Sequence, residues 1–254
     1  MENLIDSYTI RASNTGDGET EKLMAVSDIL LLLKKSRLFQ GLHDHEIDQI
    51  CEYAMLSERA YEKDKIIINQ GEQVRKIGII KSGSIIGVKY HYNGDSQIMR
   101  IYNQGEVFSL DAVNTTFLSS PVTLISQTDC AIIFLSYKFI FETNKISPAV
   151  KERVLFNSSV ILSNELIRMM YKIDVLSKRT LRERILTYLS IMKEKKGDPF
   201  IDIGMNQEEF AQYLCVNRSA LSTELNQMRK TGLIDYNKNR YILIKETDAL
   251  KQKK

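Results

Sequence analysis

Glycine usage changes abruptly along this chain, and that change constrains the fold more than any other feature of the sequence. Between residues 60 and 139, short apolar or alternating runs are separated by turn residues, namely Gly71, Gly83, Asn93-Gly94 and Gly105. After Pro148 no glycine occurs until Gly197. Short runs between turn residues are typical of antiparallel strands, whereas a long stretch without glycine favours helix. The sequence therefore predicts a β-rich half followed by a helical half.

The β-rich half contains a regular series of candidate strands at residues 65–69, 76–81, 84–92, 97–102, 107–109, 122–126 and 130–135. The Asn93-Gly94 pair between two of them is a strong hairpin signal. Many short strands with no helix between them predict an antiparallel, jelly-roll-like β-roll. Two short helices, near residues 27–38 and 45–54, are expected to precede the roll.

The glycine-free stretch carries a heptad pattern. Its apolar residues advance in steps of 7, 4, 3, 4 and 3, at Leu155, Leu162, Leu166, Met169, Ile173 and Leu176. We expect the first five to form a homodimer interface along one long helix. The alternative is a helix buried wholly in its own chain. Asn157 and Asn164, seven residues apart, would set the register of paired helices or face solvent.

A helix-turn-helix is predicted near the C-terminus. A hinge at residues 174–177, a helix over 181–192 and a strand at 200–203 lead to it. Residues 206–214 form an amphipathic helix with Asn206 as N-cap and Glu209 completing the capping box. After a break at 215–217, Asn217 caps a second helix over 218–228. Residues 233–236 and 240–244 then predict a hairpin, the wing of a winged helix-turn-helix.

Short polar and basic residues line the start of the second helix, where base edges in the major groove come within reach. The predicted base contacts are Arg218, Ser219, Ser222 and Thr223. The predicted phosphate contacts are Gln207, Asn217, Lys238 and Arg240. The alternative is a helical pair with a polar outer face that binds no nucleic acid.

Charge is distributed unevenly along the chain. Residues 1–176 hold 19 Lys and Arg against 22 Asp and Glu, a net charge of −3, whereas residues 177–254 hold 16 against 10, a net charge of +6. The C-terminal third is therefore the basic, nucleic-acid-binding candidate. The alternative is that lysines such as Lys193, Lys195 and Lys196, with the terminal ones, only solvate the surface.

These patterns divide the chain into four regions. We expect a polar N-terminal tail at 1–24, a β-roll sensor domain at 25–146, a dimerisation helix and hinge at 147–177, and the winged helix-turn-helix at 178–254. The fold class is α+β. No apolar run approaches the ~20 residues of a membrane span, and no secretory pattern opens the sequence, so we expect a cytoplasmic protein without membrane contact.

Cysteine and histidine spacing predicts neither a metal site nor a cofactor. Cys51, Cys130 and Cys215 are far apart, without CxxC spacing, and are interpreted as reduced and structural. His43 and His45 form the one close histidine pair, which fits a helix start better than a metal site.

Several motifs together resemble the Crp/Fnr family of transcriptional regulators over residues 27–246. They are residues 32–42, 66–72, 77–84, 93–95, 104–108 and 128–131, which are similar to a cyclic-nucleotide-binding roll, and 184–185 and 206–234, which are similar to the DNA-binding end. The resemblance implies a homodimeric regulator that binds an inverted-repeat operator in double-stranded DNA, with RNA polymerase as a partner and a small-molecule effector in the roll.

The effector site departs from the pattern of members that bind cyclic AMP. Those members carry Phe-Gly-Glu-Leu and, ten residues after the Glu, an Arg. Here Leu110 replaces the Glu and Ser120 stands where the Arg belongs. The tentative effector pocket is Phe108, Ser109, Leu110, Asp111, Ser120 and Thr123. Without either charge, a cyclic phosphate would lose its charge-assisted bonds, so cyclic AMP is not expected to bind.

The other cofactors of the family are not expected either. Residues 1–50 contain no cysteine for an iron–sulfur cluster, and His91 does not match the haem ligand of the roll. The competing hypothesis is a small-molecule-binding module, or a roll-type enzyme, whose C-terminal domain makes protein contacts. Roll enzymes need a His-rich metal triad, which a single roll histidine cannot supply, so no enzymatic activity is expected.

Overall fold

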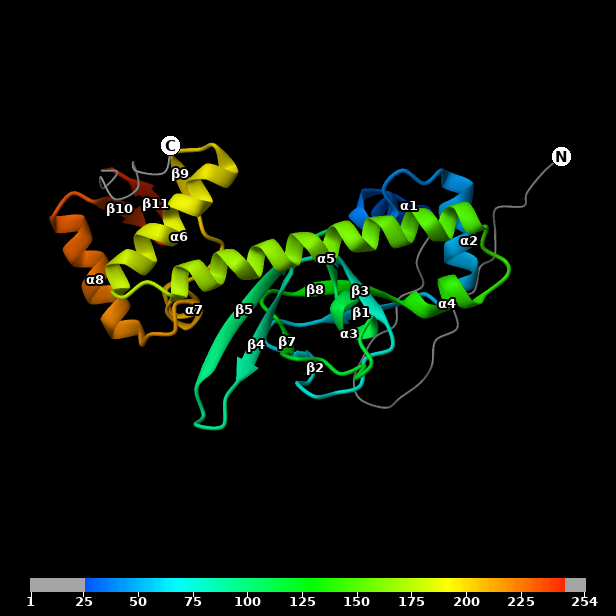
Figure 1. Cartoon of the computed structure of the whole chain (residues 1–254), viewed down its shortest axis with the longest axis horizontal. Coiled ribbons are helices and arrows are strands. Elements are labelled where there is room, and N and C mark those ends of the chain that lie inside the picture. The colour runs from blue at the N-terminus through cyan, green and yellow to red at the C-terminus, as the bar shows by residue number, and fades with distance from the viewer. Residues whose placement is uncertain (1–25, 245–254) are drawn as a thin grey trace. The chain divides into compact units, whose positions relative to one another are not determined.

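The computed structural model describes residues 26–244 and divides into two compact units (Figure 1). The first comprises the chain up to Asp95 together with Met99–Asn164, and the second comprises Ser96–Ile98 together with the chain from Glu165. The predicted tail at 1–24 and the terminal lysines lie outside the described residues. Within those residues, no helix is long and apolar enough to cross a membrane.

The strands of the β-roll form two four-stranded sheets. One sheet has the order β1 (Ser57–Tyr61), β8 (Cys130–Leu135), β3 (Ile77–Ser82) and β6 (Val107–Phe108). The other has the order β2 (Ile66–Ile68), β7 (Thr123–Ser126), β4 (Ser84–Tyr90) and β5 (Ser96–Asn103). The β1–β8, β3–β8, β3–β6, β2–β7 and β4–β7 pairs are antiparallel, which confirms the predicted roll.

The predicted hairpin lies between β4 and β5, which Figure 1 shows as a long two-stranded projection. Gly94 adopts φ +85°, a conformation that glycine reaches without steric cost. His91 N donates to Asp95 O at 2.9 Å and closes the loop.

The core of the roll lies between its two sheets. Central strands β3 and β8 contribute side chains that are fully buried: Ile77, Ile79, Ile80, Ile132, Ile133 and Leu135. Gly78 permits a close approach in this layer, since a Cβ there would lie 2.0 Å from the Phe108 ring. Phe108 in turn packs edge-on against Phe134, with ring centroids 5.9 Å apart.

Short helices accompany the roll. They are α1 (Val26–Lys35), the 3-10 helix η1 (Arg37–Phe39), α2 (Asp44–Tyr53), α3 (Leu110–Val113) and α4 (Tyr137–Glu142). Helices α1 and α2 lie where the sequence predicts two short helices. The sequence pattern predicted neither α3 nor α4, and it also missed strand β1.

Helix α5 (Pro148–Leu176) packs its first turns on the roll through the fully buried Val150 and Val154. Asn157 is also buried, and its Nδ2 donates to the carbonyls of Leu38 and Gln40, both at 2.9 Å. Asn157 therefore caps the end of η1 within its own chain and does not face a partner helix or solvent, contrary to both alternatives that the sequence left open.

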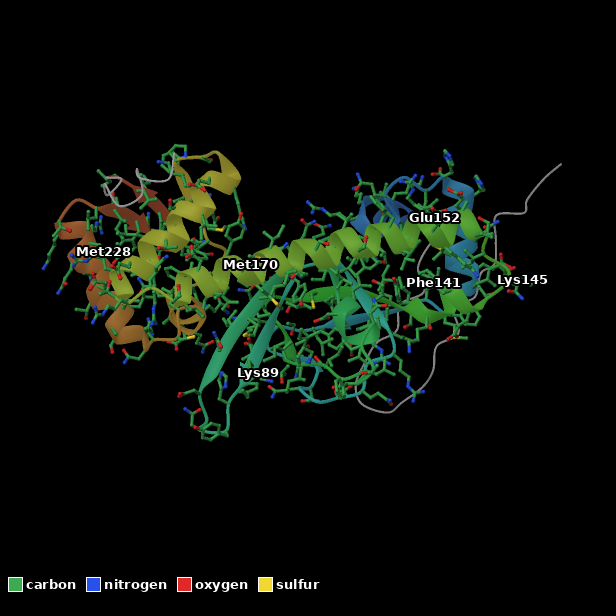
Figure 2. The ribbon with its side chains drawn as sticks, in the orientation of Figure 1. Lys89, Phe141, Lys145, Glu152, Met170 and Met228 are labelled. Carbon is green, nitrogen blue, oxygen red and sulfur yellow. The ribbon has the colours of Figure 1, made fainter. Side chains whose placement is uncertain are left out.

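The second unit is a helical domain with a small antiparallel sheet. It contains α6 (Leu181–Lys196), α7 (Gln207–Tyr213) and α8 (Arg218–Lys230), with the sheet order β10 (Ile234–Asn237), β11 (Arg240–Leu243) and β9 (Phe200–Asp202). Fully buried side chains from each helix and the sheet meet in its core, among them Ile185, Leu189, Phe210, Leu225, Tyr241 and Met228, which Figure 2 labels on α8.

Candidate nucleic-acid interface

A capping box positions helix α7. Asn206 adopts extended backbone angles, and its Oδ1 accepts from Glu209 N at 3.0 Å. In return, Glu209 Oε2 accepts from Asn206 N at 2.7 Å. The box satisfies two main-chain donors and sets the first residue of the helix, as the sequence predicts.

The turn between α7 and α8 is tight. Cys215 takes the left-handed conformation with φ +57°, and Val216 N donates to Ala211 O at 3.0 Å. Asn217 then begins α8, because its Oδ1 accepts from Ala220 N at 2.8 Å. The same oxygen accepts from Ser219 Oγ, also at 2.8 Å. The cap therefore fixes both the start of α8 and the hydroxyl of its second residue.

Helix α8 is amphipathic. Leu221, Leu225 and Met228 are fully buried and hold one face against the domain core. Arg182 of α6 forms a 2.6 Å ion pair with Glu224, which helps to fix the orientation of α8 about its own axis. These contacts leave the opposite face outward.

Among the predicted base-contact residues, Ser219 and Thr223 lie on that outward face and Arg218 and Ser222 flank it, all four within the first two turns of α8. Arg218, Ser219 and Thr223 are exposed, and Ser222 is half-buried. Arg218 Nε lies 4.0 Å from Glu208 Oε2 of α7, an acidic neighbour that the sequence reasoning did not single out. This contact uses the Nε edge of the guanidinium, whereas a bidentate contact to guanine uses the two terminal amino groups.

The predicted phosphate-contact residues lie on α7, at the start of α8 and on the wing. Gln207 is half-buried at the first position of α7, and Lys238 and Arg240 are exposed on the wing. Lys238 takes φ +55° in the two-residue turn between β10 and β11. Asn217 is exposed, but its Oδ1 serves the helix cap, so only its amide donors are directed to other partners.

Arg184 links the segment that follows α5 to the helix-turn-helix. Arg184 Nε donates to Lys178 O at 3.1 Å, and Arg184 Nη1 donates to Leu214 O at 3.2 Å. A cation beside the C-terminal carbonyls of α7 is favourable for the helix dipole. Arg184 therefore joins the residues after α5 to the turn before α8.

The tentative effector residues only partly form one pocket. Ser109, Asp111 and Ser120 line the same space, together with Tyr102 and Val122. That space has a volume of about 10 Å³, whereas ligand pockets typically enclose roughly 300–1,000 Å³. These residues therefore do not enclose a preformed cavity large enough for a small-molecule effector.

The remaining effector candidates serve the roll itself. Phe108 and Leu110 are buried in its core, and Thr123 Oγ1 accepts from Gln70 N at 3.1 Å. Strand β5 adds two side chains near this space, Arg100 and Tyr102. Arg100 pairs with Glu106 at 3.0 Å, and its guanidinium lies 3.9 Å from the centroid of the Tyr102 ring.

Metal ligands do not gather in the part of the chain that the structure describes. Residues 26–244 contain no group of three or more His, Cys, Asp or Glu side chains arranged to hold a metal ion. Burial raises the pKa of Cys51 to about 12 and that of Cys130 to about 11, so both are protonated thiols at neutral pH.

The predicted dimer seam lies largely on the surface of its own chain. Leu155, Leu166, Met169 and Ile173 are each more than half exposed, along with Phe156 and Met170, which is labelled in Figure 2. Leu162 differs, because it is half-buried and packs against the core of the roll. The exposed apolar face of α5 therefore includes four of the five predicted seam residues.

Comparisons with known proteins assign both halves of the chain. Residues 58–143 match the cyclic nucleotide-binding domain, and residues 183–253 match the Crp-like helix-turn-helix domain. The chain belongs to the Crp/Fnr family of transcriptional regulators. The resemblance predicted from the sequence motifs is thereby confirmed.

Two curated relatives and one solved structure illustrate the similarity. Electron transport regulator A of Shewanella oneidensis is 23% identical over 209 residues, which are 80% of each chain. Regulatory protein HlyX of Actinobacillus pleuropneumoniae is 23% identical over 215 residues, 82% of this chain and 86% of that one. The c-di-GMP-responsive regulator CLP of Xanthomonas campestris shares the fold, with a TM-score of 0.66 and 17% identity over 80% of this chain and 100% of that one.

This Crp/Fnr regulator thus combines a cyclic-nucleotide-binding-like sensor domain with a helix-turn-helix DNA-binding domain. The two curated relatives above are named as regulatory proteins.

Proposed function

We propose that this regulator binds an inverted-repeat operator in double-stranded DNA as a homodimer, with α8 of each subunit in the major groove. One observation carries the proposal. Arg218, Ser219 and Thr223 are exposed together at the capped start of α8, while the other face of that helix is fully buried. Two such helices related by a two-fold axis read half-sites about one helical turn, ~34 Å, apart.

Within the interface, Arg218, Ser219, Ser222 and Thr223 contact bases, and Gln207, Asn217, Lys238 and Arg240 contact phosphates. Arg218 recognises guanine through its two terminal amino groups. Ser219 acts as an acceptor, because its single proton is donated to Asn217 Oδ1 at 2.8 Å. An acceptor in the major groove selects the amino group of adenine or cytosine.

The homodimer forms through α5. Its exposed apolar residues follow one helix face over five turns, a pattern that a single soluble chain rarely leaves open to solvent. Leu155, Leu166, Met169 and Ile173 belong to this face, and Leu162 contributes only through its exposed edge.

The roll senses a signal other than cyclic AMP, or none, and the protein has no enzymatic activity. The small space beside Ser120 and the replacement of both charged positions support this view. The regulator works in the cytoplasm and acts on transcription through RNA polymerase, as the family membership suggests.

The test is a fluorescence-anisotropy titration of labelled random duplex DNA at low and moderate salt. Phosphate contacts predict binding at low salt that weakens steeply as the salt concentration rises, with a slope near −0.9 for each phosphate neutralised. Absence of binding at low salt, or a flat salt dependence, would refute the proposal and favour a domain that makes protein contacts.

A further inference from the structure

The outward face of α8 extends beyond the residues assigned above. Ser219, Thr223 and Asn226 lie at i, i+4 and i+7, so all three are on one side of the helix. Asn226 is exposed, and neither the motif pattern nor the comparisons give it a role. Lys230, at i+11 from Ser219, continues this row at the last residue of the helix and is also exposed.

A tyrosine from the wing holds the Asn226 side chain. Tyr236 Oη donates to Asn226 Oδ1 at 3.1 Å. The tyrosine ring is itself constrained, because it stacks on the buried Tyr241 with centroids 5.5 Å apart and planes 16° apart. The guanidinium of Arg229 also lies 5.6 Å from the ring centroid, and Arg229 pairs with Asp235 at 3.0 Å.

This arrangement sets the polarity of the amide. Since Oδ1 accepts from Tyr236, the Nδ2 group with its two protons is what Asn226 presents outward. An asparagine that reads adenine needs its oxygen and its nitrogen together on one base edge, and here the Tyr236 hydroxyl already occupies one of the two lone pairs of the oxygen. The two protons of Nδ2 match the oxygens of a phosphate, which accept hydrogen bonds.

The position along the helix points to the same ligand. Asn226 lies eight residues beyond Arg218, an axial rise of about 12 Å. The major groove is about 12 Å wide, so a helix whose start reads base edges has reached the sugar-phosphate backbone at that distance. We propose that Asn226 is a further phosphate contact of this regulator, and that Tyr236 is the positioning residue that directs its amide donors toward DNA. The proposal rests on the proposed placement of α8 in the major groove.

The first test compares two variants for binding to a selected operator and to random duplex DNA. Asn226→Asp keeps an acceptor for Tyr236 but replaces the donors with a negative charge, so we expect affinity to fall about tenfold or more on both DNAs. Gln227→Glu adds the same charge at the next residue, which is exposed and lies about 100° around the helix from Asn226, and is the matched control. We expect it to cost about threefold at most, by long-range repulsion.

The role of Tyr236 is tested by a double-mutant cycle. Tyr236→Phe keeps the stacked ring and removes only the hydroxyl. We expect it to weaken binding about threefold in the wild type and to have no effect in an Asn226→Ala background. Circular dichroism melting of each variant verifies that the domain remains folded.

The outcomes separate this inference from the proposed function. Equal losses for Asn226→Asp and Gln227→Glu, in a protein that binds DNA with a steep salt dependence, would overturn the phosphate contact alone. If Tyr236→Phe weakened DNA binding as much in the Asn226→Ala background as in the wild type, the positioning role of Tyr236 would be overturned. Failure of the wild-type protein to bind DNA at low salt would instead overturn the proposed function itself.

Discussion

The ammonium group of Lys172 lies 4.3 Å from the centroid of the Tyr213 ring, so a residue near the end of α5 rests on the helix that begins the helix-turn-helix. Lys172 is buried, and desolvation lowers its pKa to about 8. The ring supplies a cation–π contact but no counter-ion of opposite charge. Burial of this cation therefore lowers the free energy of unfolding, by an amount that depends on pH.

The first prediction concerns that pH dependence. The pKa of Lys172 in the folded protein lies below the value near 10.4 of an unfolded chain, so the unfolded state binds more protons between about pH 8 and pH 10. This residue therefore makes the free energy of unfolding rise with pH in that window. Replacing Lys172 with Met should stabilise the protein at pH 7 by up to about 3 kcal/mol, and the advantage should shrink toward pH 9.5.

Urea denaturation of both proteins, at several pH values from 7 to 9.5, measures the difference. The buried thiols of Cys51 and Cys130 have raised pKa values and so make the free energy of unfolding fall as pH rises. Both proteins contain these thiols, so their contribution cancels when the two free energies are subtracted. Lys230→Met, at an exposed lysine of α8, is the control and should give a difference that does not change with pH. A pH-independent advantage for Lys172→Met would mean that the amine is neutral or solvated throughout.

The second prediction concerns the dimer. Leu166 is 62% exposed on α5, so a charge there leaves the fold of the single chain intact but places a charged group in the proposed interface. Leu166→Glu should therefore yield monomers in light scattering. Leu162 is a poorer choice, because its packing against the roll would couple dimerisation to stability.

Phe200→Glu provides the matched control for the dimer experiment. Phe200 is 58% exposed on β9, far along the chain from the seam, and the substitution introduces the same charge at an apolar residue. We expect this variant to remain dimeric. A dimeric Leu166→Glu variant would show that α5 does not form the interface.

The third prediction concerns the roll. The space beside Ser120 is about 10 Å³, and Leu110 and Ser120 replace the two charged residues of the motif in members that bind cyclic AMP. Calorimetry with cyclic AMP and cyclic GMP at millimolar concentration should therefore give no heat of binding. A micromolar dissociation constant would contradict this prediction, and the variants Arg100→Gln and Asp111→Asn would then identify the group that binds the nucleotide.

Local patterns predicted most of the fold, and the elements they missed have non-local causes. Strand β1 has the sequence Ser-Glu-Arg-Ala-Tyr, without apolar alternation. It is a strand because it pairs with β8 along its whole length, with Ser57 opposite Phe134 at one end and Tyr61 opposite Cys130 at the other. Helix α3 follows Ser109, which takes the left-handed conformation with φ +62° that sequence propensity assigns to glycine. In α4, Lys151 Nζ of α5 binds the carbonyls of Phe141 and Thr143 and ends the helix.

The candidate interface was more predictable than the effector pocket, for a physical reason. Caps such as Asn206 and Asn217 and the spacing of Leu221 and Leu225 are local signals, so they place the outward residues of α8 directly. The roll pocket depends instead on which side chains of neighbouring strands face inward. Arg100 could be assigned to its place beside Glu106 only once the turn after β5 was known.

The last prediction concerns sequence readout. Arg218 is exposed at the first position of α8, and a bidentate contact to guanine provides roughly 1–3 kcal/mol of discrimination. Arg218→Ala should lower operator affinity about tenfold per half-site and relax the preference at one symmetric base pair. Lys238→Ala, at the exposed turn of the wing, should weaken binding to every sequence alike and flatten the salt slope by about one per half-site.

Binding of both variants to a selected operator, to its point-mutated forms and to random DNA distinguishes the two roles. The contrast is informative because each variant removes one positive charge, so a general electrostatic effect lowers both affinities equally. Loss of discrimination in Arg218→Ala alone assigns base readout to that residue. If Arg218→Ala weakened all sequences equally, Arg218 would be a phosphate contact, and the readers would be Ser219, Ser222 and Thr223. Undiminished binding by both variants would remove α8 and the wing from the DNA interface altogether.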